Sequence, residues 1–226
     1  MNLTILPLIL MLAAVLPMPT SAQSKRDSDS YFEGHIHYVM NYTDLKGQNI
    51  NDKVAAFFDR EQKVFVNATN YMVMNERGQH VKLYQADNNA YFFFNRDNTA
   101  YKIDQTAKTT RWVRVFDVDD VDTILGYPCK AIKVDADFRA YIYFYNPEIK
   151  VDVTPYLNYN MEEWNAYLKA SGGALPLRVI TIDVRSKFIE DKRAISINPS
   201  KLSNAHFAFP KSVKLKRPKY GVDLVW

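Results

Sequence analysis

The sequence predicts an α+β domain in which an antiparallel β-sheet dominates and one helix docks on it. Apolar and polar residues alternate with the two-residue period of β-strands along much of the chain. Short polar turns separate the candidate strands, which favours antiparallel pairing over βαβ crossovers. Only one stretch has the apolar spacing of a helix together with start and stop signals.

Residues 1–22 are predicted to be a cleaved signal peptide. The apolar run Leu3–Val15 precedes Thr20-Ser21-Ala22, whose small residues fit the cleavage rule. The run is too short to span a bilayer, and an uncleaved N-terminal anchor is the alternative. Residues 23–30 are polar and predict a flexible new N-terminus. We therefore expect a periplasmic or secreted protein with no transmembrane segment after signal cleavage.

The rest of the chain is predicted to form one β-rich domain over residues 31–210 and a basic C-terminal tail over residues 211–226. The roughly 200 residues that remain suffice for one core but hardly for two. The formal net charge is +4. The tail could bind an anionic surface, or it could be a solvated terminal segment. It lacks interleaved aromatic residues for stacking bases, so we expect no nucleic-acid partner.

The predicted sheet is organised around the hairpin Ile124–Tyr145. Gly126-Tyr127-Pro128 is typical of a turn, and Cys129–Val134 alternates as a half-buried strand does. The next strand, Ala140–Tyr145, is apolar on both faces, with Tyr141, Tyr143 and Tyr145 on one and Ile142 and Phe144 on the other. Such a strand must be covered on both sides or line a cavity.

Further strands are predicted along the chain in both directions from this hairpin. Asp117–Asp122 is expected to be an acidic link, Asn146-Pro147 a break, and Val54–Phe58 either helix or strand. The remaining strands are predicted over Tyr31–Tyr42, Lys63–Val66, Val81–Tyr84, Ala90–Phe94, Ala100–Ile103, Arg111–Phe116, Ile149–Val153 and Leu175–Val184, with one or two more within Arg185–Ile197.

One helix is predicted between Asn160 and Gly172. Asn160 is the expected N-cap, and Glu163 stands in the capping-box position three residues on. An apolar stripe follows, and Gly172-Gly173 ends the helix. The stripe consists of Met161, Trp164, Tyr167 and Leu168. We expect Trp164 to be buried against the sheet.

Four short motifs carry a family resemblance: Phe32-x-Gly34-x-Ile36, Ile124-x-Gly126-Tyr127-x-Cys129-Lys130, Gly173-x-Leu175-Pro176-Leu177 and Phe207-x-Phe209-Pro210. In this order, behind a signal peptide, they resemble uncharacterised exported proteins of Gram-negative envelopes. Those proteins are similar in turn to the LolA/LolB-like superfamily of lipoprotein carriers and receptors. The resemblance implies a strongly curved antiparallel half-barrel with helices on its concave face. It transfers no functional residue.

No motif in the sequence indicates catalysis. Nucleophile-elbow, zincin, P-loop and dinucleotide fingerprints are absent from the sequence. His35 and His37 could hold a metal, but an exposed polar strand face explains them better, and Asp117–Asp122 lacks EF-hand spacing. The single cysteine, Cys129, is better explained as a small buried hydrophobe than as a catalytic thiol. We therefore expect a protein that is not an enzyme, with no catalytic residue, metal site or cofactor.

The sequence contains more aromatic residues than a single core needs, with 15 Tyr and 13 Phe. Tyrosine suits an apolar pocket that has a few hydrogen-bonding groups, although a core built from large side chains is the alternative. One short helix cannot cover a many-stranded curved sheet, so we expect an apolar pocket between the two. The predicted ligand-binding residues are Tyr38, Phe92, Phe94, Tyr143 and Trp164.

These expectations lead to two functional hypotheses. The first is an exported binding protein that holds an apolar ligand, which could be a lipid, an acyl chain or a lipoprotein, in the cavity of a half-barrel. The second is an envelope protein-protein interaction or structural module with no small-molecule ligand. An apolar small molecule or lipoprotein is the partner in the first case, and another envelope protein in the second.

Overall fold

The computed structural model describes residues 31–103 and 110–216. The predicted signal peptide, the predicted flexible N-terminus and residues 217–226 of the predicted tail lie outside the described residues. Within the described ranges no helix is long and apolar enough to cross a membrane.

One large sheet holds all twelve strands that the described residues form. Its order is β12-β6-β5-β4-β3-β2-β1-β11-β10-β9-β8-β7, and every neighbouring pair is antiparallel except β12 with β6. The sheet is open, since β12 and β7 form separate edges. The strands are β1 (Gly34–Asp44), β2 (Glu61–Val66), β3 (Asn70–Asn75), β4 (His80–Gln85), β5 (Ala90–Phe94), β6 (Thr99–Ile103), β7 (Val113–Ile124), β8 (Tyr127–Ala136), β9 (Arg139–Lys150), β10 (Ala174–Asp183), β11 (Phe188–Pro199) and β12 (Lys214–Lys216).

Helices are few and short in the part of the chain that the structure describes. The two α-helices are α1 (Asn51–Val54) and α2 (Trp164–Ala170), and the 3-10 turns are η1 (Ala86–Asn88), η2 (Thr154–Tyr156), η3 (Met161–Glu163) and η4 (Asn204–Phe207). A dominant, mostly antiparallel sheet with few helices confirms the predicted α+β class.

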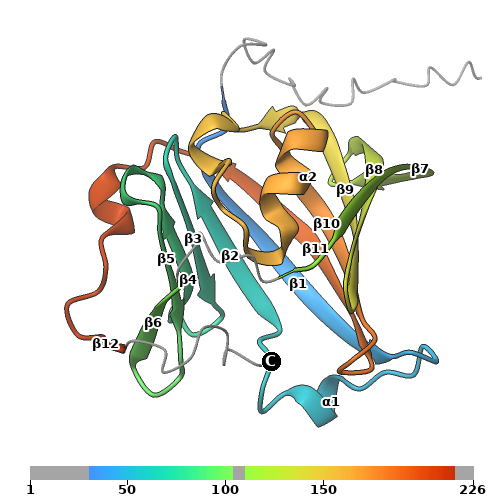
Figure 1. Cartoon of the computed structure of the whole chain (residues 1–226), viewed down its shortest axis with the longest axis horizontal. Helices are drawn as coiled ribbons and strands as arrows, with labels where there is room; N and C mark the ends of the chain where they lie inside the picture. Colours follow the sequence, from blue (N-terminus) through green and yellow to red (C-terminus); the bar gives the residue numbers. More distant parts are fainter. Residues whose placement is uncertain (1–30, 104–109, 217–226) are drawn as a thin grey trace, which may run out of the picture. The chain divides into compact units, whose positions relative to one another are not determined.

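The sheet bends around α2 (Figure 1). Trp164, the first residue of α2, lies 5.6 Å from the ring of Tyr71 on β3 and 6.5 Å from that of Tyr143 on β9. Four strands separate β3 from β9 in the sheet order. A single indole can contact both only if the strands between them curve around it. Trp164 is buried, as predicted.

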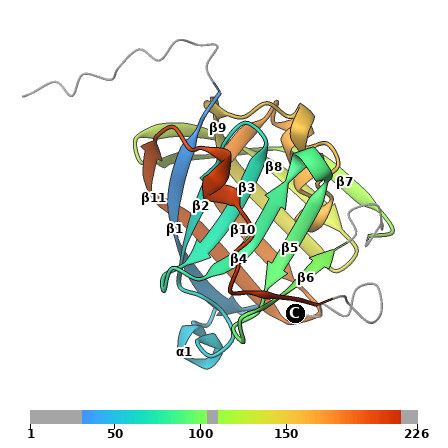
Figure 2. The same cartoon turned by 90° about the vertical axis from the view of Figure 1, so that its left-hand side faces the viewer.

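The other face of β3 to β5 is covered by the chain's own C-terminal segment. Figure 2 shows η4 and the residues after it crossing this face toward β12. The side chains beneath form a separate apolar cluster of buried residues, which we call the outer cluster: Met72, Leu83, Ala90, Phe92, Phe94, Ala100 and Phe207. The apolar residues on both faces of these strands therefore have cover on both sides.

Two strand predictions were wrong in the same way. The expected acidic link Asp117–Asp122 is part of β7, and the expected break at Asn146-Pro147 lies inside β9. β7 pairs with β8 on both sides of a register shift between Val118 and Asp122, and the Asn146 side chain donates to Pro128 O of β8 at 2.8 Å. These contacts with a neighbouring strand overrode the local turn propensity of Asp, Asn and Pro. The sequence pattern also missed β3, a strand buried on both faces.

The predicted capping box of the helix is also wrong. Helix α2 begins at Trp164, and Glu163 precedes it in a left-handed conformation, with φ +56° and no side-chain cap. Glu163 instead accepts a hydrogen bond from Thr110 Oγ1 at 2.6 Å. Glu162 also has a positive φ and pairs with Lys82 of β4. Contacts to distant residues thus decide where this helix begins.

Candidate ligand-binding cavity

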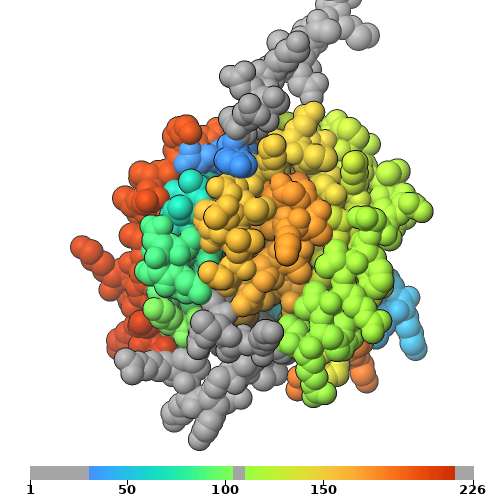
Figure 3. All heavy atoms as spheres, turned by 45° about the horizontal axis from the view of Figure 1, so that its top comes forward, coloured from blue at the N-terminus to red at the C-terminus, as the bar shows by residue number. Residues whose placement is uncertain are grey.

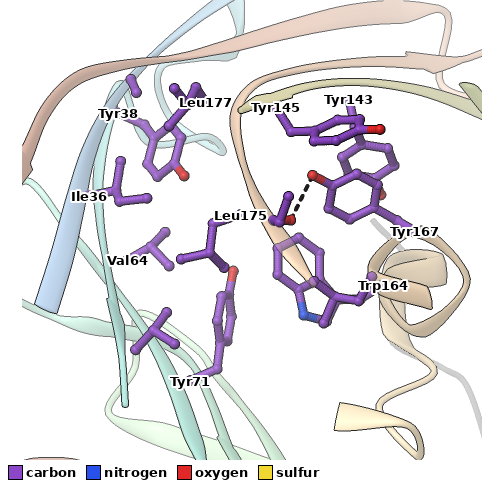
Figure 4. Close-up of a cluster of buried hydrophobic side chains, with 14 of the residues drawn as sticks. Ile36, Tyr38, Val64, Tyr71, Tyr143, Tyr145, Trp164, Tyr167, Leu175 and Leu177 are labelled. Atoms are coloured by element: carbon purple, nitrogen blue, oxygen red, sulfur yellow. Dashed lines mark hydrogen bonds between the residues drawn. The ribbon is translucent and has the colours of Figure 1, made fainter. Parts of the chain in front are cut away.

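A cavity of about 580 Å³ lies between the bent sheet and α2. Its walls come from strands β1 to β6 on one side and β9 to β11 on the other, together with Glu162 and Trp164. Figure 4 shows the two walls facing each other, with Tyr38, Val64 and Tyr71 opposite Tyr143 and Trp164. In Figure 3, α2 and the segment before it form the cover between the strands. Exposed Phe57 and Arg96 belong to the lining where it reaches the protein surface.

Tyrosine rings make up much of the cavity wall because alternate strand residues point to the same face. Two of their hydroxyl groups are used in structural hydrogen bonds. Tyr38 donates to Pro176 O at 2.6 Å, and Tyr143 donates to Glu162 O at 3.0 Å. Burial raises the pKa of Tyr38 and Tyr143 far above the usual value, so both stay neutral. The rings therefore present mainly apolar surface to the cavity.

A charged cluster interrupts this apolar wall. It consists of Lys82 on β4, Glu162 in η3, and Glu190 and Lys192 on β11. Lys82 and Glu162 form an ion pair across the cavity. Burial alone would raise the pKa of Glu162, but attraction to Lys82 outweighs it and the pKa is lowered. The Glu162 side chain lines the cavity and keeps 41% of its surface accessible.

Lys192 is the second cation of the cluster. Its Nζ donates to Gln62 Oε1 at 2.8 Å and lies 4.8 Å from the centre of the Tyr38 ring. Among the described residues no carboxylate lies within ion-pair distance of it. Burial, reinforced by repulsion from Lys82, lowers the pKa of Lys192 to about 8. The ammonium form therefore still predominates at neutral pH.

Glu190 lies two residues before Lys192 on β11 and belongs to the same cavity lining. Burial raises the pKa of Glu190 although Lys192 and Lys82 act against this rise. Tyr42 shares a hydrogen bond with the Glu190 side chain. At the edge of the lining, Asp59 pairs with Arg96 at 3.5 Å, and Arg139 pairs with Asp183 at 2.8 Å.

Trp164 contributes a polar atom as well as its ring. Among the residues that the structure describes, its Nε1 is the one buried side-chain nitrogen or oxygen that has no hydrogen-bond partner. The side chain keeps only 9% of its surface accessible and belongs to the cavity wall. Buried polar groups are nearly always paired, so an unpaired one calls for an explanation.

The structure brings four of the five predicted site residues to this cavity. Tyr38, Phe94, Tyr143 and Trp164 belong to its lining. Phe92 does not, because it points to the opposite face and packs on Phe209 at 4.9 Å between ring centres. Phe94 also contacts Phe209, at 5.7 Å.

Sequence reasoning missed the charged cluster altogether. Lys82 lies between Val81 and Leu83, and Glu190 and Lys192 belong to the charged run Glu190–Arg193. Charged side chains on strands usually face solvent. The neighbouring residues Asp191 and Arg193 could have indicated from sequence that some charges of this strand face inward. These residues belong to ion pairs with Arg178 and Asp122, so the charges of β11 point to both faces.

The other sites considered from sequence have structural partners. His37 pairs with Glu61 at 2.9 Å, and the ring of His35 lies 5.1 Å from that of Phe65. Cys129 is buried. Within residues 31–103 and 110–216 no group of three or more His, Cys, Asp or Glu side chains is placed to hold a metal ion.

Comparisons with known proteins found no matching family model and no matching curated protein. Several solved structures are similar. PNGF-II is 14% identical over 82% of this chain and 32% of its own, with a TM-score of 0.48. This chain thus spans about a third of PNGF-II. An uncharacterised conserved protein from Thermus thermophilus is 10% identical over 82% of this chain and 91% of its own, with a TM-score of 0.44.

A DUF1329 family protein from Desulfovibrio piger is also similar, with 9% identity over 80% of this chain and 91% of its own. Its TM-score is 0.30. Likenesses this distant carry no functional argument, so the function must be argued from the cavity itself.

Proposed function

We propose that this chain is an exported binding protein that holds an apolar ligand in its cavity, and that the ligand is a lipid, an acyl chain or a lipoprotein. In this proposal the bent sheet acts as a half-barrel of the LolA/LolB-like kind, with α2 on its concave face. The protein binds its ligand and does not transform it. The predicted signal peptide would deliver it to the periplasm or the medium.

The cavity between the sheet and α2 is the single observation that carries this proposal. Its volume of about 580 Å³ falls within the roughly 300–1,000 Å³ of ligand pockets. Rings and aliphatic side chains make up most of its lining, and thirteen polar or charged side chains line the rest. A well-packed interior has few voids larger than a water molecule, so packing does not explain a space of this size.

Binding of Nile red, a neutral apolar fluorophore, tests the proposal. Thr181 lines the cavity on β10, whereas its neighbour Ile182 does not. Thr181→Trp should fill the cavity and weaken binding by about tenfold or more, while Ile182→Trp is the matched control and should stay close to wild type. Equal binding by both variants, or none by the wild type after delipidation, would contradict the proposal. Native mass spectrometry of the purified protein would identify a retained ligand.

An interaction module is the second candidate function, and edge strand β7 favours it. Val113, Val115, Phe116 and Val121 are all exposed along this strand, on a sheet edge that has no neighbour within the described residues. Exposed apolar edges pair readily with another chain. Under this hypothesis the protein would carry no lipid in native mass spectrometry. Val115→Lys would abolish binding to a partner and leave Nile red binding unchanged.

A further inference from the structure

The cavity wall offers a hydrogen-bond donor whose capacity the protein does not fill. It is the Lys192 ammonium group, which has three donors and makes one hydrogen bond, to Gln62. Lys192 belongs to the lining of the cavity. A ligand that fits this donor must bring an acceptor atom as well as apolar surface.

The charges facing Lys192 decide what kind of acceptor fits. Glu162 is neutralised by Lys82, and Asp59 is paired with Arg96. Glu190 shares a hydrogen bond with Tyr42, and burial favours its neutral form. The Lys192 ammonium group is therefore the charge in this cluster that no neighbouring group neutralises.

We infer that the cavity selects an amphiphile with a carboxylate headgroup, a long-chain monocarboxylate, with the headgroup on Lys192. This inference rests on the proposed function and names its ligand class. The carboxylate accepts charge-assisted hydrogen bonds from Lys192 Nζ, and the chain lies along the rings of Tyr38 and Tyr143. The Trp164 side chain belongs to the lining of the same cavity. A cationic headgroup would instead meet Lys192 and Lys82.

Competition against bound Nile red tests the headgroup with three ligands that share one chain: hexadecanoic acid, hexadecanol and hexadecylamine. The acid should displace the probe from the wild-type protein at a concentration about tenfold below that of the alcohol, since a hydrogen bond to a charged group contributes that much. The amine should be the weakest. Equal displacement by acid and alcohol, or strongest displacement by the amine, overturns the inference and leaves the proposed function standing.

Two substitutions test whether Lys192 causes the preference for the acid over the alcohol. Lys192→Met keeps the aliphatic stem and should erase the preference for the acid while leaving the alcohol unchanged. Lys63→Met is its matched control, because Lys63 is exposed on β2 and absent from the cavity lining; it should behave as wild type. Retention of the preference by Lys192→Met would refute the role of Lys192. If Nile red does not bind at all, the proposed function itself fails.

Discussion

The two faces of strands β3 to β5 carry similar residues, but one face is closely packed and the other lines a cavity. Their outer face packs under Phe207 and Phe209 into a filled apolar cluster. Their inner face presents Tyr71, Lys82 and Phe93 to a cavity. The difference lies in the cover. The C-terminal segment crosses the outer face closely, whereas α2 has only the seven residues Trp164–Ala170 and spans a wide bend.

This comparison shows that aromatic content does not by itself indicate a binding site. A cavity remains where the covering element is too small for the surface beneath it. On the inner face, charged side chains line that space, whereas on the outer face apolar side chains pack against one another. Substitutions on the two faces should therefore have different costs.

The largest loss of stability is expected from Phe207→Ala in the outer cluster. Phe207 is fully buried, and no cavity adjoins it, so truncation creates a void and removes apolar contacts. We expect the free energy of unfolding to fall by about 3–5 kcal/mol. Urea denaturation followed by tyrosine and tryptophan fluorescence measures it. A loss below about 1 kcal/mol would show that the C-terminal segment is not a structural cover.

A smaller loss is expected from Trp164→Ala on the inner face. The side chain is larger than Phe207, but it adjoins an existing cavity and leaves an N–H unpaired. We expect a loss of about 3 kcal/mol or less, below the usual range for a fully enclosed aromatic. The same denaturation series provides the comparison. A cost above that of Phe207→Ala would mean that the inner face is packed as tightly as the outer.

The fold was more predictable from sequence than the site. The alternation of apolar and polar residues assigned Tyr38 and Tyr143 to the correct strand faces, because it depends only on the two-residue period of a β-strand. It could not decide which of Phe92 and Phe93 points inward, since a shift of one residue inverts the face. That choice depends on the crossing of residues 204–207 over β3 to β5, a contact between segments more than a hundred residues apart. The buried pair of Lys82 and Glu162 depends equally on distant segments.

Removing one hydroxyl group from the inner face should lower the free energy of unfolding by a still smaller amount. Tyr143→Phe deletes the hydrogen bond to Glu162 O and leaves the ring stacked on Tyr167 at 4.0 Å. We expect a loss of about 1 kcal/mol, the usual net contribution of one hydrogen bond. Tyr91→Phe, at another buried inner-face position, is a control for loss of a hydroxyl whose hydrogen-bond partner is Tyr159 rather than Glu162 O. If Tyr143→Phe costs no more than this control, the bond does not anchor the start of α2.

The smallest effect concerns the pH dependence of stability. Because the pKa of Lys192 falls from its ordinary value of 10.5 to about 8 in the folded protein, the unfolded chain binds more protons between these values. Lys192 therefore makes stability rise as pH increases from about 8 to about 9, below the pKa of about 10 at which the tyrosines of the unfolded chain ionise. The groups that act on it are Lys82, Glu190, Glu162 and Asp59. The measurable effect is small because this window covers only part of the interval between the two pKa values.

Lys192→Met should remove this rise, and Lys63→Met on the outer face should keep it. Denaturation at about pH 8 and about pH 9 for the three proteins measures the difference directly. The comparison matters because the two lysines differ mainly in the face they occupy. If both variants retain the wild-type dependence, Lys192 is solvated like a surface lysine, and the distinction between the inner face and an ordinary protein surface fails.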